Sequence, residues 1–507
     1  MGVILTIIGL YFLVLIGISV LAAKRGRKTV EDYFVANRSI GVFVLSMSVF
    51  ATLFSAFTFI AEPGMIYSLG TGFWAGLPLG NILFSTFILM LGYKIWQVGR
   101  KNNLVTPVEL FRDRFESPAL AVVMFVVMVI LVVPYLAIQP IAAGQMLSAV
   151  SDGSIPYLAG ATLVTGVIII YVFISGQRAV AWIDTFQGIL LLLVVWITLF
   201  VAASALGGFA SASQQLASKS PEMLTIAGPK NFWTQRMTFS WIVFVALNIM
   251  LQPQIFARYY TGNSVKTIKW SFATWPVLAA LAIWPPVLIG AYGKLIAPNL
   301  AQADQIVPHL WRTLTPVWFQ GIALAGLLSA LMSTASGQLL SLSSMFTRDL
   351  YLPYINPKAS STQQYRTGRI IVVVLALCGL LVGIRPPALA GLLAGAAFSG
   401  IAILAPAAIA AFYWRRATAP AVIISIIAGE LIVLSTYFGV IPKSAWLGFD
   451  ASIPGLLLTT VLMIVISLCT KPPSEAAINR YMKPKPRLGA GTATLPVMEA
   501  ADYQGDR

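Results

Sequence analysis

A short polar strip lies inside an otherwise apolar segment, residues 315–351. Within it Ala330, Ser333 and Thr334 stand at positions i, i+3 and i+4, so a helix would place one carbonyl and two hydroxyls on one face. Hard cations such as Na+ prefer oxygen ligands. The strip therefore predicts a cation site. Ordinary packing is the alternative, because small residues also line contacts between transmembrane helices.

Three carboxylates fall within or beside long apolar runs: Glu62, Asp184 and Glu430. Charges inside a bilayer are costly unless they are paired or hydrated, so each is a functional candidate. Asp184 follows Arg178 by six residues, and both an ion pair that anchors the helix and a role on an ion pathway are consistent with this spacing. Glu62 precedes Pro63 and is a candidate for the outer vestibule. Glu430 has no obvious partner in the sequence, and a polar helix contact would explain it.

The elements that hold these residues are membrane-spanning helices. Hydrophobic residues make up 58% of the 507 residues, charged residues make up 10%, and the mean hydropathy is +0.85. Apolar runs of about twenty residues, the length of a helical crossing, recur almost to residue 470. The fold class we expect is an all-α polytopic membrane protein with about 13 transmembrane helices. Because the chain has only two cysteines, a disulfide scaffold is excluded.

The spans that we predict determine the topology. They lie near 3–23, 40–68, 74–96, 118–149, 155–175, 180–206, 238–257, 270–297, 316–346, 368–384, 388–413, 418–441 and 453–470. The first run is too long for a signal-peptide core and lacks a cleavage site, so we expect it to be retained.

Placing the N-terminus outside puts most of the 33 basic residues on the inner side, as the positive-inside rule requires. The net charge of +16 then needs no nucleic-acid partner. We expect residues 1–470 to form one transmembrane domain in the plasma membrane. The tail, 471–507, would be cytoplasmic and disordered.

Two predicted spans contain helix breakers. Pro63 and Gly64 interrupt span 40–68, and Gln252, Pro253 and Gln254 interrupt span 238–257. Unwound backbone at membrane depth supplies the carbonyls and amides with which carriers bind ions and solutes. The two spans are five apart, which predicts an inverted repeat of five plus five helices, about 40–206 and 238–413. A prolyl kink without function is the alternative.

Four stretches carry a resemblance to a known family: EDYFVANRSIG at 31–41, SGQRAVAWIDTFQG at 175–188, RYYTGNSVKTIK at 258–269 and SALMSTASGQLLSLSSMFTRDLY at 329–351. They resemble the sodium:solute symporters, which include carriers for proline, pantothenate, monocarboxylates, sialic acid and sugars. The resemblance covers roughly residues 5–470. It implies an extra N-terminal helix, two inverted five-helix repeats and trailing C-terminal helices.

The resemblance also implies a sodium site. Its ligands would be the carbonyls of Ala51, Phe54 and Ala330 and the hydroxyls of Ser333 and Thr334. This moves the break in the first repeat helix to residues 51–54, where the sequence has no Gly or Pro.

Some relatives hold a second sodium ion. Asp184 and Ser336 match its ligands, but Gly337 replaces a further hydroxyl. We therefore expect one Na+ per cycle, with Asp184 and Ser336 on the inner ion pathway or Asp184 bridging to Arg178.

Solute contacts are expected at the break in span 40–68 and on spans 118–149 and 238–257. The candidates are Thr58, Gln139, Trp241, Phe244, Asn248 and Gln252. Span 118–149 contains no Arg or Lys, so a carboxylate would be held by amides, hydroxyls or a helix N-terminus. The stretches GIRPPALAGLLAGAAF and AAFYWRRATAPA resemble the pantothenate and monocarboxylate branch, which favours a small carboxylate as solute. A proline-like amino acid is the alternative.

Enzymatic chemistry is not suggested. The chain has one histidine, His309, no nucleotide-binding glycine loop and no Ser-His-Asp set. The expected partners are a small solute, Na+ and the lipid bilayer, with no obligatory protein partner. The asymmetric polar strip disfavours a channel, and a solute sensor without transport is the remaining alternative.

Overall fold

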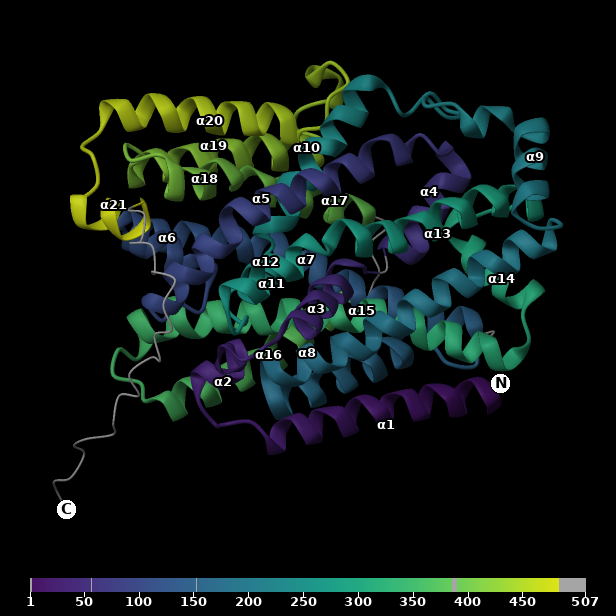
Figure 1. Cartoon of the computed structure of the whole chain (residues 1–507), viewed down its shortest axis with the longest axis horizontal. Helices are drawn as coiled ribbons and strands as arrows, with labels where there is room; N and C mark the ends of the chain where they lie inside the picture. The colour runs from purple at the N-terminus through teal and green to yellow at the C-terminus, as the bar shows by residue number, and fades with distance from the viewer. Residues whose placement is uncertain (1, 56, 152, 385–389, 483–507) are drawn as a thin grey trace, which may run out of the picture.

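The computed structural model describes residues 2–55, 57–151, 153–384 and 390–482, and within these ranges it is helical without a β-strand. Most long helices run along one common direction (Figure 1). The first half comprises α1 (Gly2–Lys24), α2 (Val30–Val35), α3 (Val42–Leu53), the π-helical η2 (Phe57–Ala61), α4 (Glu62–Leu69), α5 (Phe73–Lys101), α6 (Pro107–Phe115), α7 (Pro118–Val150), α8 (Tyr157–Ala205) and α9 (Phe209–Lys219). The second half comprises α10 (Gln235–Leu251), α11 (Pro253–Tyr259), α12 (Val265–Ala273), α13 (Trp275–Ile296), η4 (Ala303–Gln305), α14 (Ile306–Leu314), α15 (Val317–Met345), η5 (Phe346–Ile355), α16 (Ser361–Gly383), α17 (Ala390–Ile403), α18 (Ala405–Tyr413), α19 (Ala419–Tyr437), α20 (Ser452–Cys469) and α21 (Glu475–Met482).

The described ranges contain ten helices that are long and apolar enough to cross a membrane, or up to twelve when two bent pairs are each taken as a span. One of the ten, α8, has 49 residues and is broken at Gly176, where φ is 59° and ψ is −144°. At 1.5 Å per residue, α8 would extend about 74 Å if straight, more than twice the hydrocarbon thickness of roughly 30 Å. A Cβ at residue 176 would lie 2.4 Å from the Tyr33 carbonyl oxygen, so only glycine fits. Counting the two parts of α8 as separate crossings gives the expected thirteen.

Two helices are broken in corresponding places. α3 ends at Leu53, Phe54 is extended (φ −88°, ψ 92°), and the chain resumes as η2 and α4 at an angle of 60°. α10 and α11 meet at 57° around Gln252, with Pro253 as the first residue of α11. The break at Gln252 is where the breakers predict it. The prediction of a break at Pro63 is wrong. Pro63 lies in the first turn of α4, where a backbone N–H has no helical partner to lose.

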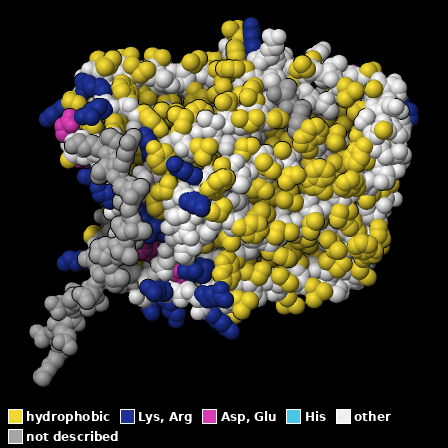
Figure 2. Space-filling model, viewed as in Figure 1, with side chains coloured by type: hydrophobic (Ala, Val, Ile, Leu, Met, Phe, Trp, Pro, Cys, Tyr) yellow, Lys and Arg dark blue, Asp and Glu magenta, His cyan; other side chains and the backbone are white. Residues whose placement is uncertain are grey.

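Helix α15 lies in the interior, against α1, α3, α7 and α8 (Figure 1). Its side chains from Ala323 to Met345 are all buried. Lipid-facing apolar side chains instead cover the outer helices, and Figure 2 shows them spread over most of the visible face. Lys and Arg gather in that view toward the end where α2, α6 and α21 lie. The polar strip of α15 is therefore an interior feature and does not face lipid.

The beginning of the tail is folded, which corrects the expectation of disorder from residue 471 onward. Ala477, Ile478 and Tyr481 form the buried face of α21. The Tyr481 hydroxyl donates to the Leu110 carbonyl at 3.1 Å and to Asp113 Oδ2 at 2.8 Å on α6. The amphipathic pattern of α21 therefore lets this eight-residue helix bury one face against the protein. Residues 483–507 lie outside the described part.

Candidate functional site

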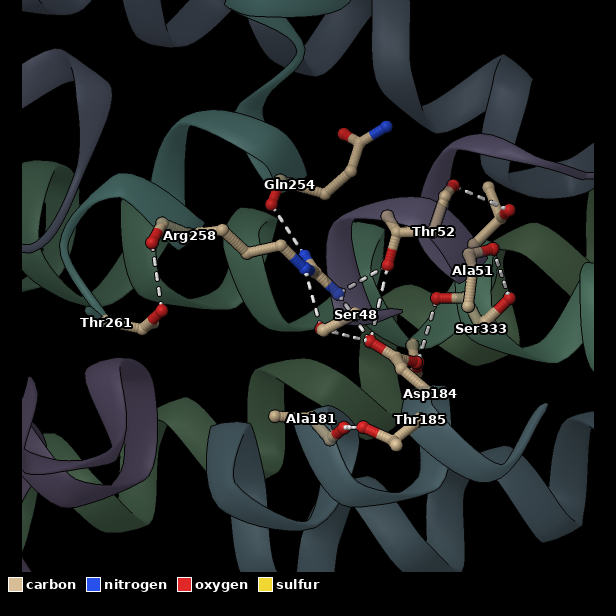
Figure 3. Close-up of polar contacts among 12 residues, drawn as sticks. Ser48, Ala51, Thr52, Ala181, Asp184, Thr185, Gln254, Arg258, Thr261 and Ser333 are labelled. Carbon is tan, nitrogen blue, oxygen red and sulfur yellow. Dashed lines mark hydrogen bonds and ion pairs between the residues drawn. The ribbon is translucent and has the colours of Figure 1, made fainter. Parts of the chain in front are cut away.

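The hydroxyls of α15 meet the broken end of α3. Ser333 Oγ donates to the Ala51 carbonyl at 2.7 Å (Figure 3). Thr334 Oγ1 donates to the Thr52 carbonyl at 2.9 Å. Both hydroxyls also lie near the Ala330 carbonyl, at 3.2 and 3.1 Å. Because α3 ends at Leu53, these α3 carbonyls lack amide donors from a following turn. The structure thus brings Ala51, Ala330, Ser333 and Thr334 together in a buried cluster of oxygens.

Phe54 continues this cluster along the chain. Its backbone is extended at the end of α3, which takes its carbonyl out of the helical ladder. Its ring stacks on Trp275 with centroids 5.7 Å apart. An oxygen-rich break with small hydroxyl side chains opposite it has the chemistry that a small hard cation requires.

A buried ion pair lies beside these oxygens. Arg258 Nη2 of α11 is 2.8 Å from Asp184 Oδ2 of α8, and the side chains are 1% and 0% exposed. Ser48 of α3 donates to Asp184 Oδ2 at 2.6 Å and accepts from Arg258 Nε at 3.0 Å (Figure 3). Arg258 also donates to Thr52 Oγ1. The pair therefore joins three helices directly beside the break in α3.

The ion pair between Arg178 and Asp184 that the sequence allows is absent, and that alternative is wrong. Arg178 Nη2 lies 2.6 Å from Asp32 Oδ1 of α2 instead. Both residues follow the break at Gly176 on one helical stretch, where six positions correspond to roughly 240° of rotation and 9 Å of rise, so their side chains lie on different faces of α8.

Ser336 and Gly337 occupy different surroundings. Ser336 Oγ donates to the Ser333 carbonyl of its own helix at 3.0 Å. A Cβ at Gly337 would lie 3.2 Å from Arg258 Nη1 and 3.1 Å from Thr52 Cγ2. The guanidinium therefore occupies the space beside Gly337.

A cavity of about 690 Å³ opens next to the break in α3. Its wall includes five of the six predicted solute residues, namely Thr58, Trp241, Phe244, Asn248 and Gln252. It also includes Phe54 and Ser55, so it borders the oxygen cluster. Gln139 is not part of the wall; it is 1% exposed and its Nε2 lies 3.5 Å from the Tyr135 carbonyl.

Aromatic rings form much of the inner wall. The ring centroids of Trp241 and Phe244 are 5.3 Å apart, those of Phe244 and Phe398 are 6.0 Å apart, and those of Phe398 and Tyr135 are 4.7 Å apart. The Tyr135 hydroxyl donates to Ser55 Oγ at 3.4 Å, at the break in α3. Sequence reasoning missed Tyr135 and Phe398. The position of Tyr135, one turn before Gln139, is the signal that could have found it.

Glu62, which the sequence makes a candidate for the outer vestibule, lines this cavity and has 2% of its surface exposed. Its Oε1 is buried without a hydrogen-bond partner among the described residues. Glu430 is also buried, with neither carboxyl oxygen bonded in the described ranges, but it lies outside the cavity wall and faces Gly400 of α17. Asp304 stands at the wall outside the spans, where partial loss of water beside Gly64 raises the pKa of its carboxyl.

Comparisons with known proteins agree with this geometry. The family model described as the sodium:solute symporter family matches residues 33–429. The sodium/pantothenate symporter of Escherichia coli (strain K12) is 30% identical over 463 residues, which cover 90% of this chain and 94% of that protein. The sodium/proline symporter of the same organism is 28% identical over 474 residues, covering 90% and 92%.

A solved structure of a Na+-coupled sialic acid symporter in a substrate-bound, outward-open state has the same fold. It matches with a TM-score of 0.78 at 20% identity, covering 93% of this chain and 99% of that one. Mhp1, a nucleobase-cation-symport-1 family transporter in a closed conformation, matches with a TM-score of 0.57 at 15% identity. The architecture of two inverted repeats is thus shared with solved transporters.

Proposed function

The chain belongs to the sodium:solute symporter family and is therefore a sodium-coupled, multi-pass membrane transporter rather than an enzyme, and from this premise we propose its ion site, solute class and orientation. Its solute is a small organic molecule carrying a carboxylate, of the monocarboxylate or pantothenate kind. It is imported by alternating access between the two sides of the membrane. Uptake of a proline-like amino acid is the second candidate, and the likeness to the sodium/proline symporter supports it.

One observation carries the ion site: the hydroxyls of Ser333 and Thr334 lie within hydrogen-bonding distance of the α3 carbonyls at Ala51 and Thr52. Sodium binds to the carbonyls of Ala51, Phe54 and Ala330 and to the two hydroxyls. The ion replaces the hydroxyl protons as the partner of the carbonyl oxygens, and so ties α3 to α15.

Coupling follows from this tie. An ion that fixes the break in α3 also orders the cavity wall at Ser55 and Thr58, so solute and sodium each bind more tightly when the other is present. The sodium concentration gradient drives accumulation of the solute, and the inward-negative potential adds about 2.3 kcal/mol per 100 mV when the solute has no net charge, as for an amino acid.

One sodium ion accompanies each solute. Gly337 supplies no hydroxyl, and the guanidinium of Arg258 fills the space beside it and neutralises Asp184. Asp184 and Ser336 serve the inner exit path of the ion.

The solute contacts Thr58, Trp241, Phe244, Asn248 and Gln252, which share the cavity. The side-chain amide of Gln252 donates to Asn248 Oδ1 at 3.3 Å, so both amides sit at the break between α10 and α11. Amide and hydroxyl groups hold the carboxylate here. Gln139 does not contact the solute in this proposal; its side-chain amide supports the wall residue Tyr135 through the carbonyl of that residue.

The protein lies in the plasma membrane with its N-terminus outside and its C-terminus in the cytoplasm. The gathering of Lys and Arg at the end that carries α2, α6 and α21 supports this orientation (Figure 2). Residues 1–470 form one transport domain, with repeats over about 40–206 and 238–413.

Uptake into proteoliposomes with an imposed sodium gradient tests the proposal. Purified full-length protein is expected to concentrate a radiolabelled small carboxylate above its outside concentration only when sodium is high outside. Equilibration without accumulation would indicate a channel, and solute binding without uptake would indicate a sensor. Either result contradicts the proposal.

A further inference from the structure

The wall of the cavity carries more negative than positive charge. Among the described residues its ionisable side chains are Glu62, Asp304 and Asp450 against Lys443, with the phenols of Tyr135 and Tyr437. None of the three carboxylates forms an ion pair within the described ranges. A cleft lined mainly by one sign of charge attracts ligands of the opposite sign.

Asp450 already has neutral partners. Its Oδ1 accepts from Ser399 Oγ at 3.1 Å and from the Ser452 amide at 2.9 Å, and its Oδ2 accepts from the Tyr437 hydroxyl at 3.2 Å. Asp304 is exposed at the mouth. Of the three carboxylates, only Glu62 is fully buried with an oxygen that lacks a partner in the described part.

Glu62 stands one turn beyond Thr58, on the segment that begins at the break in α3. A buried carboxylate without a counter-charge is costly, and pairing with a cationic group of an incoming ligand offsets part of that cost. Replacing it by a neutral amide would leave the local geometry in place, so its charge and its packing can be separated by experiment.

The aromatic rings indicate which kind of cation fits. Trp241, Phe244 and Phe398 present ring faces in the same cavity. Such faces attract organic ammonium groups, whereas sodium requires a shell of oxygen ligands. The oxygen cluster at Ala51 and Ser333 meets that requirement at a separate place.

We infer that the transported solute carries a protonated amine in addition to its carboxylate, and that Glu62 is the counter-charge of this amine. The inference rests on the proposed function and chooses between its two solute classes, because it favours the second candidate, an amino acid, or another zwitterion over a monocarboxylate or pantothenate. In this arrangement the amine lies between Glu62 and the aromatic rings, while the amides at Asn248 and Gln252 bind the carboxylate.

Matched pairs of solutes test the inference on the unaltered full-length protein. Sodium-driven accumulation of radiolabelled solute in proteoliposomes is measured for L-proline against cyclopentanecarboxylate, L-alanine against propionate, and L-phenylalanine against 3-phenylpropionate, with pantothenate as a further amine-free solute. At least one amine-bearing solute is expected to be accumulated, and its partner without the amine is not at the same concentration. Accumulation of the amine-free carboxylates alone, or of no amine-bearing solute, would overturn the inference. The proposed function would fail only if no solute of either kind were accumulated.

A pair of variants then tests Glu62 itself. Glu62→Gln is expected to raise the half-saturating concentration of the amine-bearing solute about tenfold or more, because a charge-assisted contact is lost. Glu430→Gln is the matched control, since Glu430 is equally buried but outside the cavity wall, and it should leave that concentration unchanged. An unchanged value in Glu62→Gln, or a change in the sodium requirement alone, would contradict the assignment.

Discussion

Arg258 and Asp184 form an ion pair with 2.8 Å between Nη2 and Oδ2, at a place from which solvent is excluded. The pair links α11 in the second repeat with α8 in the first, and both residues bond to Ser48 of α3. It therefore fixes the two broken helices relative to each other beside the oxygen cluster. Such a position couples the arrangement of the repeats to the geometry of the ion site.

Breaking this pair on one side is expected to destabilise the protein strongly. Asp184→Asn leaves the Arg258 guanidinium buried without its counter-charge, which costs roughly 3–5 kcal/mol. The melting temperature in detergent should fall, and the double variant Asp184→Asn with Arg258→Gln should recover part of the loss. Asp32→Asn is the control, because its partner Arg178 is 15% exposed and can rehydrate. Additive losses in the double variant would contradict the coupling.

Removal of either hydroxyl opposite α3 should weaken sodium binding. Ser333→Ala or Thr334→Ala deletes one oxygen ligand, and a bond to a charged group is worth about 1.5–3 kcal/mol. Half-maximal uptake should therefore need a sodium concentration at least about ten times higher. Ser343→Ala is the control, because that hydroxyl bonds to the Leu340 carbonyl of its own helix. Sodium activation curves that coincide with the unaltered protein would count against the site.

The ratio of sodium to solute is expected to be one. Arg258 occupies the space beside Gly337, so a second ion would meet a fixed positive charge. Reversal potentials of currents coupled to a zwitterionic solute, measured over a range of sodium gradients, give the ratio directly. A ratio of two would show that water or another oxygen replaces the hydroxyl that Gly337 lacks.

The fold class was predictable from composition and hydropathy, because a bilayer forces long apolar helices. The break at Gln252 was predictable too, since Pro253 has no N–H to donate. The break after Leu53 was not, because tertiary contacts with Ser333 and Thr334 satisfy the freed carbonyls and no local residue marks them. The Arg258 to Asp184 pair spans 74 residues of sequence, so local spacing could indicate Arg178 as a partner but not Arg258.

Solute capture should depend on pH through Asp304. Its pKa is raised by partial burial, so as pH falls toward that pKa the carboxylate gains a proton and the mouth of the cavity loses a negative charge. The half-saturating concentration of an amine-bearing solute should therefore rise as the pH falls toward this raised pKa, at a higher pH than an ordinary aspartate would require. Asp304→Asn should flatten this rise, because that variant leaves the neighbouring ionisable residues His309 and Arg312 of α14 and Glu62 of α4 in place. Identical pH profiles would exclude Asp304 as the titrating group.

The contact between α21 and α6 should protect the chain around α21 from proteolysis. Tyr481→Ala removes two hydrogen bonds, to Leu110 and Asp113, and the ring that packs on Phe412 at 5.4 Å. The loss of a large buried side chain costs roughly 3–5 kcal/mol, enough to release one short helix. Trypsin should then cleave after Arg480 faster in inside-out vesicles, because Lys471 precedes a proline and is not a trypsin site, and Tyr354→Ala, which alters a 52% exposed tyrosine, should not change the rate. Cleavage in right-side-out vesicles would instead place this end outside the cell and reverse the proposed orientation.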